Sequence, residues 1–175
     1  MNFTLTMDDL VNPKTKEYLK LKEYILSPQF CWYYLPTNVL FESEYNNFGF
    51  YEQEILRRQE TRTRANNPLL PRFVQVYKQI LQHNNITPQR PYRINVNSVH
   101  PTPDNTDPSP PHIDHDYSHQ IMIIYLTPTY NGHTIVQGEP QPREEDDILL
   151  FNGEHYHHLY PPQSNRRVVI VFTLP

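Results

Sequence analysis

The sequence is poor in cysteine and in long apolar runs. Cys31 is the single cysteine among 175 residues, which excludes an internal disulfide and any zinc motif built from paired cysteines. The longest apolar runs have about six residues, far short of the ~20 that a membrane-spanning helix needs. The N-terminal stretch MNFTLTMDDL lacks the charged start and apolar core of a secretory signal. We therefore expect a cytoplasmic protein that does not span a membrane.

Positive charge and glycine are also scarce. The formal net charge is -4, so there is no general attraction to nucleic acid or to an anionic membrane, and composition disfavours a dedicated nucleic-acid-binding protein. Only 4 glycines stand against 18 prolines, which predicts long loops stiffened by proline. The hydrophobic fraction of 37% is typical of a folded protein, and the length fits a single domain, 1–175.

Two amphipathic helices are predicted in the first half of the chain. Residues 14–26 place Tyr18, Leu21 and Ile25 on one stripe and the lysines on the other face, and Pro28 ends this helix. A second helix is predicted within residues 67–85, where apolar residues recur at spacings of four, three and four. Between the two helices, an aromatic-rich stretch without helical period predicts short strands and loops.

From residue 92 the hydrophobic period changes to two. The segment YRINVNSV alternates apolar with polar residues, as a strand with one buried and one solvent-facing side does. Further strands are predicted at 120–126, 132–136, 147–151 and 167–174, separated by turn signals that include Pro140 to Pro142. Helices followed by many short strands predict an α+β fold, in which a jelly-roll core (92–175) is braced by a helical and irregular N-terminal part (1–91).

Histidines gather in the strand-rich half. Seven of the 9 lie between residues 112 and 158. Successive side chains of a strand alternate faces, so His112 and Asp114 project the same way and can hold one ion together. A third ligand has to come from another segment, and the turn that precedes the last strand offers His155, His157 and His158. Two imidazoles and one carboxylate on one face of an ion are typical of non-haem Fe(II) oxygenases.

The order of these motifs resembles the 2-oxoglutarate and Fe(II)-dependent dioxygenase superfamily. His112-Ile113-Asp114 stands where that family has its His-x-Asp, and IIYLTP resembles its Tyr-Leu-Asn strand, with Thr127 in place of Asn. NGHTIV is similar to the Gly-Gly-x-Thr stretch, and ILLFNGEHYHHLYPPQSNRRVVIVF to the distal-His turn and Arg-bearing final strand. Upstream, SPQFCWYY is similar to a segment of compact phage and bacterial members. The resemblance covers 92–175 and implies a double-stranded β-helix, in the cytoplasm of the host if a phage encodes the chain.

The resemblance also implies which residues form the site. His157 fits the family's distal histidine. Leu159 and Pro161 follow it at the family's spacing, and Arg166 lies nine residues after His157. His158 with Arg167 is the same frame shifted by one, and His155 fits less well. By the resemblance, Arg166 would bind the distal carboxylate of 2-oxoglutarate, which suits a bidentate guanidinium.

Further site residues are expected from the same comparison. Tyr125 would hydrogen-bond that carboxylate from a neighbouring strand. Asp116 would replace Asp114 only if the strand register shifted. The remaining histidines, His115, His119 and His133 among them, are expected to be solvated or to support the ligands.

The implied activity is an oxygenase that uses Fe(II), 2-oxoglutarate and O2 to hydroxylate a C–H bond of a protein side chain or a small molecule, releasing succinate and CO2. Two alternatives are a nucleic-acid demethylase of the same superfamily, which the net charge disfavours, and a non-enzymatic jelly-roll module that binds zinc or no metal. We expect a monomer or weak dimer.

A basic stretch separates the two halves of the chain. It is either a mobile lid or, as we favour, a solvated loop, and the aromatics before it are expected to pack in the core or a lid. The arginines are Arg57, Arg58, Arg62, Arg64 and Arg72, and the aromatics are Tyr45, Phe48, Phe50 and Tyr51.

Overall fold

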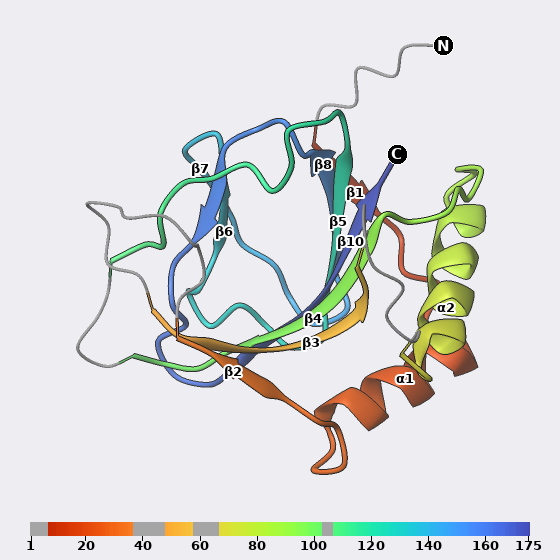
Figure 1. Ribbon diagram of the computed structural model, residues 1–175, viewed down its shortest axis with the longest axis horizontal. Helices are drawn as coiled ribbons and strands as arrows, with labels where there is room; N and C mark the ends of the chain where they lie inside the picture. Colours follow the sequence, from red (N-terminus) through yellow and green to blue (C-terminus); the bar gives the residue numbers. More distant parts are fainter. Residues whose placement is uncertain (1–6, 37–47, 58–66, 103–106) are drawn as a thin grey trace.

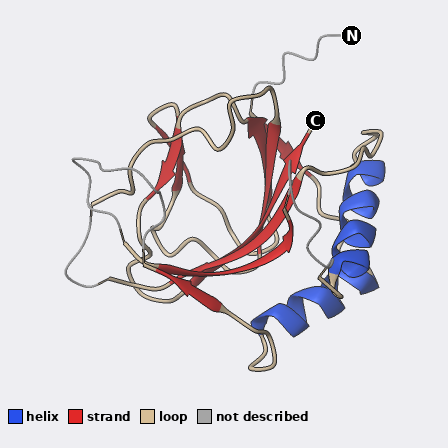
Figure 2. Cartoon of the chain, in the orientation of Figure 1, coloured by secondary structure: helices blue, strands red, loops and turns tan. Residues whose placement is uncertain are grey.

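A computed structural model describes residues 7–36, 48–57, 67–102 and 107–175. In this part of the chain a large curved sheet faces a small sheet, and two helices cover the outer side of the large one (Figures 1 and 2). The helices are α1 (Lys16–Leu26) and α2 (Leu70–His83). The strands are β1 (Asp8–Leu10), β2 (Tyr33–Leu35), β3 (Phe50–Leu56), β4 (Arg93–Val99), β5 (Gln120–Tyr125), β6 (Thr134–Val136), β7 (Glu139–Gln141), β8 (Ile148–Asn152), β9 (His157–Leu159) and β10 (Arg167–Leu174).

The two sheets form a double-stranded β-helix. The large sheet has the strand order β1-β8-β5-β10-β4-β3-β2 and the small sheet has the order β7-β6-β9. All the pairings are antiparallel. The predicted α+β jelly roll braced by helices is therefore confirmed. The N-terminal part does more than brace it, since β1, β2 and β3 extend the large sheet at both edges.

Strand alternation divides the apolar residues of the large sheet between two clusters. On β10, Val168, Ile170 and Phe172 face the helices and pack in the larger cluster, which the residues of α1 and α2 complete. Val169 faces the opposite way, into a smaller cluster shared with Val136 of the small sheet. The space between the sheets is thus lined by the odd-numbered residues of β10 and their cross-strand neighbours.

Both helices form close to the predicted ranges. α1 is capped by the Thr15 hydroxyl, which accepts a hydrogen bond from the Tyr18 amide, and it buries Tyr18, Leu21 and Ile25, as predicted. α2 has Pro71 in its first turn, where a missing N–H costs no helical hydrogen bond. Its buried face includes Phe73 and Ile80. None of the described helices is both long and apolar enough to cross a bilayer.

Two short strands occupy segments that were predicted to be turns. Residues 139–141 form β7 at the edge of the small sheet, where Pro140 can be accommodated because an edge strand leaves half of its N–H groups outside the sheet. His157 begins β9, although the histidine-rich segment was predicted to be a turn. Cross-strand pairing with β6 explains this strand, and pairing between distant segments is not visible in local sequence.

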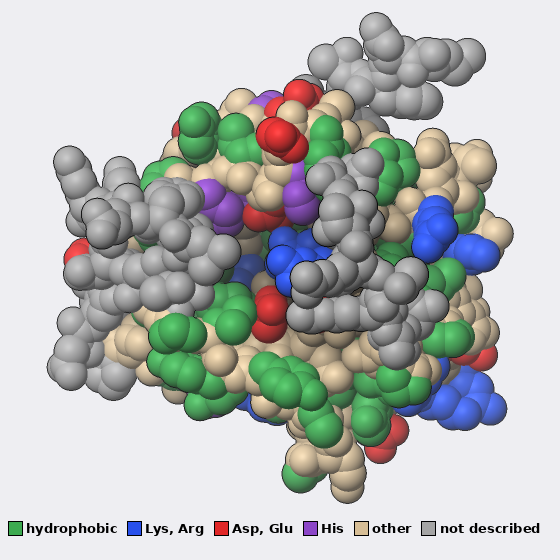
Figure 3. All heavy atoms as spheres, in the orientation of Figure 1, with side chains coloured by type: hydrophobic (Ala, Val, Ile, Leu, Met, Phe, Trp, Pro, Cys, Tyr) green, Lys and Arg blue, Asp and Glu red, His purple; other side chains and the backbone are tan. Residues whose placement is uncertain are grey.

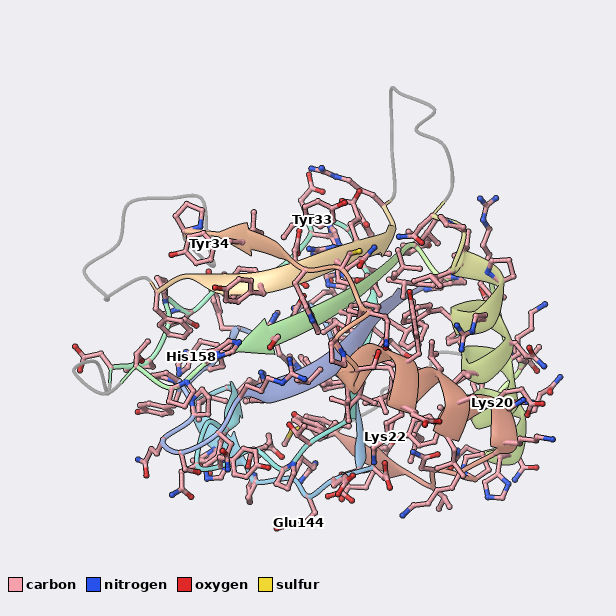
Figure 4. The ribbon with its side chains drawn as sticks, turned by 90° about the horizontal axis from the view of Figure 1, so that it is seen from below. Lys20, Lys22, Tyr33, Tyr34, Glu144 and His158 are labelled. Carbon is pink, nitrogen blue, oxygen red and sulfur yellow. The ribbon has the colours of Figure 1, made fainter. Side chains whose placement is uncertain are left out.

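The loop between β7 and β8 is attached to α1 through Asp146. Its carboxylate accepts a hydrogen bond from the Tyr18 hydroxyl at 2.6 Å and pairs with Lys22 and with Lys14. Figure 4 labels Lys22 on α1 and Glu144 in this loop. Burial alone would raise the pKa of Asp146, but the hydrogen bonds from Lys22 and Tyr18 outweigh it and lower the pKa. Asp146 therefore stabilises the packing of the helix layer on the β-helix.

Replacing Asp146 with Asn should lower the free energy of unfolding by about 1.5 kcal/mol at neutral pH, because three donors lose a charged acceptor. Since the pKa of Asp146 in the folded protein lies below the ordinary value of about 3.9 for an aspartate, this contribution is complete above that pH and disappears as the pH falls through the folded pKa. Urea unfolding from pH 7 to pH 3 measures it. Glu145→Gln is the matched control, because Glu145 also pairs with Lys22 but is half exposed. An equal loss in both variants, or a loss independent of pH, would contradict this account.

Candidate metal centre

Three predicted ligands converge between the two sheets. Nitrogen and oxygen atoms of His112, Asp114 and His157 all lie within 4.8 Å of one another. One oxygen of Asp114 is 3.4 Å from Nε2 of His112 and 3.7 Å from Nε2 of His157. Among the described residues, this is the one group of three or more acidic, histidine or cysteine side chains with such spacing.

Backbone hydrogen bonds hold the two histidines side by side. The amide of His112 donates to the carbonyl of His157 at 3.0 Å, and the amide of His157 donates to the carbonyl of His112 at 3.0 Å. This isolated antiparallel bridge joins the proline-rich loop to β9. Val136 of β6 pairs with His157 on the other side. Both ligand-bearing segments are thus positioned by main-chain pairing and not by the side chains alone.

The ring orientation leaves one nitrogen of each histidine directed at the carboxylate. Nδ1 of His112 lies 2.9 Å from the carbonyl oxygen of Pro110, and Nδ1 of His157 lies 3.1 Å from that of His155. A carbonyl oxygen only accepts hydrogen bonds, so each Nδ1 carries the proton in the neutral ring and each Nε2 keeps a lone pair. Metal-binding histidines are commonly oriented in this way.

Asp114 is half-buried and kept ionised by its neighbours. Burial raises the pKa of its carboxyl, but hydrogen bonds from His112 and His157 and the charge of Arg93 outweigh burial and hold the pKa well below its usual range. Arg93 of β4 lies 3.9 Å from the second carboxylate oxygen. For His112, burial is again the largest influence and lowers the pKa, but the bond to Asp114 and its charge raise it overall. A cation between these groups would take the place of the protons.

The structure distinguishes His157 from the alternatives that the sequence left open. His158 pairs with Ile135 in the neighbouring register position and faces the other way, toward the ring of Tyr160. Neither His158 nor His155 belongs to the three-residue group among the described residues. Asp116 is exposed. The register that would have substituted Asp116 for Asp114 is therefore not present.

Arg166 does not lie between the sheets, and this expectation needs correction. Its guanidinium donates a hydrogen bond to the Leu26 carbonyl at the end of α1, on the helix side of the large sheet. Arg167 points into the space between the sheets and is 3% exposed. The physical reason is the register of β10, where Arg167 shares the face of Val169 and Arg166 that of Val168. The sequence offered two combinations, His157 with Arg166 and His158 with Arg167. In the structure the histidine of the first faces the same space as the arginine of the second, which lies ten residues after His157.

Arg167, Tyr125 and Thr134 form a polar corner at one end of this space. Nη2 of Arg167 donates to the Thr134 hydroxyl at 2.8 Å, and the Tyr125 hydroxyl lies 2.8 Å from the same oxygen. The guanidinium carbon is 5.3 Å from the centre of the Tyr125 ring. Nε of Arg167 is buried and has no hydrogen-bond partner among the described residues. The corner therefore holds a buried cation with unused hydrogen-bonding capacity.

The corner and the ligand group are linked by β6. Thr134 touches Arg167, and Val136, two residues along the same strand face, pairs with His157. Two residues of a strand span about 7 Å. Figure 3 looks toward a hollow in this face, around which histidine, acidic and basic side chains gather. The arrangement can place a small dianion between a metal ion and a guanidinium.

Sequence reasoning missed Thr134 and Arg93 as parts of the site. Thr134 stands in the NGHTIV stretch that carried part of the resemblance, but its contact with Arg167 joins positions 33 residues apart. Arg93 was assigned to the solvent side of its strand, whereas it contacts Asp114. Neither contact has a local signal in the sequence, because both depend on which strands face each other across the two sheets.

The arginines of the basic stretch and the aromatic residues before it lie in different environments in the structure. Arg58, Arg62, Arg64 and Tyr45 lie outside the described residues. Arg57 is exposed and 3.6 Å from Glu54, and Arg72 lies over the ring of Tyr24 on α1. Phe48 is buried, Phe50 is half-buried and Tyr51 is exposed. Packing in the core, as expected for these aromatics, is therefore confirmed for Phe48.

No family model and no curated protein matches the sequence. Solved structures do match. A 2OG-Fe(II) oxygenase family oxidoreductase from Burkholderia pseudomallei is 14% identical, covers 90% of this chain and 78% of its own, and has a TM-score of 0.62. A prolyl hydroxylase from Trichoplax adhaerens, in complex with a peptide fragment of hypoxia inducible factor, is 15% identical over 98% and 84%, with a TM-score of 0.57.

A third similar structure is SnoN, a non-haem alpha-ketoglutarate-dependent epimerase from nogalamycin biosynthesis. It is 12% identical, covers 95% of this chain and 76% of its own, and has a TM-score of 0.56. The three proteins are named for different activities, and each shares its overall fold with this chain. The chain has the double-stranded β-helix fold of the 2OG-Fe(II) oxygenases.

Proposed function

We propose that the protein is a 2-oxoglutarate-dependent Fe(II) oxygenase that hydroxylates a C–H bond of a protein side chain or a small molecule. The observation that carries this proposal is the convergence of His112, Asp114 and His157 within 4.8 Å. The double-stranded β-helix fold, shared with oxygenases of different substrates, supports it.

The donor set fits Fe(II). Two imidazole nitrogens and one carboxylate are the ligands of the facial triad, which leaves further coordination positions open. His112 and His157 each orient Nε2 by donating from Nδ1 to a carbonyl, and Arg93 is positioned to fix the second oxygen of Asp114. These supports would hold the ligands in place without filling the open positions.

The polar corner fits the distal carboxylate of 2-oxoglutarate. Arg167 can donate two parallel hydrogen bonds to a carboxylate, and the hydrogen-bonded pair of Tyr125 and Thr134 hydroxyls has one further proton to donate. Because Arg167 is buried, an anion there would be bound in a low dielectric, where the attraction is strong. We assign this role to Arg167 in place of Arg166, and keep Tyr125 as its partner.

Bound Fe(II) with 2-oxoglutarate and O2 would supply an oxidant that hydroxylates a substrate C–H bond while 2-oxoglutarate is converted to succinate and CO2. The chain's own residues position and protect this chemistry. Asp114 and the two histidines hold one side of the metal, and Arg167 sets the direction of the cosubstrate. The apolar residues between the sheets, such as Ile121 and Phe151, exclude bulk water from the site.

A metal-binding module without activity is the second candidate. The ligand group alone would suit it, since zinc also binds histidine and carboxylate. Arg167 favours the enzyme, because a buried guanidinium with an unused donor has no role in metal storage. The net charge of -4 favours neither candidate but disfavours a nucleic-acid substrate.

The test is formation of succinate from 2-oxoglutarate by protein loaded anaerobically with Fe(II) and then exposed to air. We expect slow uncoupled turnover that requires both Fe(II) and 2-oxoglutarate. Isothermal titration of 2-oxoglutarate into the protein loaded with Mn(II) provides a readout independent of turnover. If millimolar 2-oxoglutarate neither binds nor yields succinate, while zinc binds tightly, the metal-binding module is the correct alternative.

A further inference from the structure

The face of β4 that looks toward the metal ligands is polar. Ile94 and Val96 belong to the cluster on the helix side, so Arg93, Asn95 and Asn97 point into the space between the sheets. Asn95 is only 2% exposed. The sequence pattern had suggested a solvent-facing side here, but the second sheet and the loop that carries His112 lie in front of it.

Several buried oxygens on this face have no hydrogen-bond partner among the described residues. They are Oδ1 of Asn95, Oδ1 of Asn97 and the hydroxyl of Thr173, which pairs with Arg93 across β4 and β10. Nδ2 of Asn95 donates to the Glu52 carboxylate at 3.0 Å, which fixes the amide so that its oxygen is the free group. Leaving a buried acceptor unpaired costs about 1–3 kcal/mol, so a ligand with hydrogen-bond donors would remove this cost.

Glu52 gives this polar wall a negative charge. We use this name for Glu52, Asn95, Asn97 and Thr173. Glu52 of β3 lies directly opposite Asn97 in the sheet, and burial raises the pKa of its carboxyl. The ionised carboxylate is thus short of compensating charge. Arg93 reduces the effect, but this guanidinium also lies 3.9 Å from Asp114.

The polar wall adjoins the corner proposed for 2-oxoglutarate at Asn97, where Val169 lies between Asn97 and Tyr125, and extends away from it. Arg167 is opposite Val99, at the end of β4 remote from Arg93. Oxygen acceptors and a carboxylate would repel the two carboxylates of 2-oxoglutarate. The wall begins beside Asp114, through Arg93, and extends along β4 and β3. A molecule on it would therefore lie next to the metal without occupying the cosubstrate position.

An exposed aromatic ring extends the wall toward solvent. Tyr33 of β2 is paired with Glu52 and is 64% exposed, at the edge of the large sheet (Figure 4). Tyrosine rings attract cations and pack against aliphatic chains. From the edge of the sheet inward, the order is therefore the aromatic ring on β2, the carboxylate on β3 and the amides on β4.

Given the proposed oxygenase function, on which this inference rests, we infer that the polar wall binds an aliphatic ammonium group of the substrate and so presents a nearby carbon to the metal. The ammonium group has three donors for the free oxygens and a charge that matches Glu52. It can come from a free small molecule or from a lysine-like side chain of a protein. The chemistry is the same for both sources.

Binding of matched probes to protein loaded with Mn(II) and 2-oxoglutarate tests this inference. The probes are N-acetyl-L-lysine amide and N-acetyl-L-norleucine amide, in which the α-amine is blocked so that they differ only in the side-chain ammonium group, and the same pair within an N-acetylated glycine-flanked tripeptide. We expect the ammonium member of at least one pair to bind about tenfold more tightly than its neutral isostere. A preference confined to the tripeptides assigns the ammonium group to a protein side chain, and one confined to the single-residue amides assigns it to a small molecule.

Variants then locate the preference. Glu52→Gln keeps the shape and an acceptor for Asn95 but removes the charge, so it should abolish the preference while metal and 2-oxoglutarate still bind. Asn97→Ala should weaken the ammonium probe and leave the neutral probe unchanged. Glu23→Gln, on the exposed side of α1, is the matched control and should behave as wild type.

The outcomes separate this inference from the proposed function. Equal affinity for both members of each pair, including no binding of either, in protein that binds metal and 2-oxoglutarate overturns the ammonium site alone. A preference that survives in Glu52→Gln also overturns it. Wild-type protein that binds neither metal nor 2-oxoglutarate overturns both proposals.

Discussion

Replacing Asp114 with Ala should lower Fe(II) affinity by at least about 100-fold while the protein stays folded. A carboxylate ligand contributes charge as well as a bond, and the two histidines that remain cannot hold the ion with comparable strength. The fold should survive because Asp114 lies beside the main-chain bridge and outside both apolar clusters. Anaerobic titration with Fe(II), or with Mn(II) as a stable substitute, measures the affinity, and circular dichroism reports the fold.

Asp116→Ala is the matched control for this experiment. Asp116 is two residues from Asp114, carries the same charge and is exposed. Its loss should change the affinity by less than about threefold through long-range charge alone. Retained affinity in Asp114→Ala, or an equal loss in the two variants, would show that the metal binds elsewhere or that net charge alone attracts it. His112→Ala should reproduce the Asp114 result.

Replacing Arg167 with Met should weaken 2-oxoglutarate binding by about 100-fold and leave metal affinity within about threefold of wild type. Removing one partner of a buried, hydrogen-bonded charge pair costs about 2–5 kcal/mol, and methionine retains much of the side-chain volume. Calorimetric titration of 2-oxoglutarate into the protein loaded with Mn(II) measures the loss. Arg167→Lys should fall between wild type and Arg167→Met, because lysine keeps the charge but not the bidentate geometry.

Arg166→Met distinguishes position from charge in this pair of adjacent arginines. Arg166 lies on the helix side and bonds to the Leu26 carbonyl, so its replacement should affect stability slightly and 2-oxoglutarate binding hardly at all. If Arg166→Met loses 2-oxoglutarate and Arg167→Met does not, the frame predicted from the sequence was correct and the assignment of Arg167 is wrong.

The local sequence carried enough information for most of the elements. Helical spacing around Leu21 and Phe73, and the alternation of apolar and polar residues in YRINVNSV, predict segments that the structure contains. The local sequence was insufficient for strands that form only by pairing with a strand far along the chain. β1, β7 and β9 have three residues each, too few for a period to be visible, and their hydrogen bonds come from strands far along the chain.

In the site, the types of residue were predictable from the sequence, but the face of the strand on which each side chain lies was not. The His-x-Asp spacing and the distal histidine turn indicated the three groups that the structure brings together, although His112 forms only an isolated bridge and Asp114 lies in a bend and not on a strand. Adjacent arginines share every local property, so the choice between Arg166 and Arg167 depends on the register of β10 against β4 and β5. Asn95 shows the same limit, since a polar side chain on a strand predicts solvent and only the second sheet makes that side an interior.

The paired amides and carbonyls of His112 and His157 have a consequence for metal loading. Because the backbone joins these residues directly, the distance between the two rings does not have to be established by the ion. Loading should therefore need little rearrangement, and the change in amide hydrogen exchange on adding metal should be confined to the few amides of this bridge. A centre assembled in advance can release and regain its ion without unfolding around it.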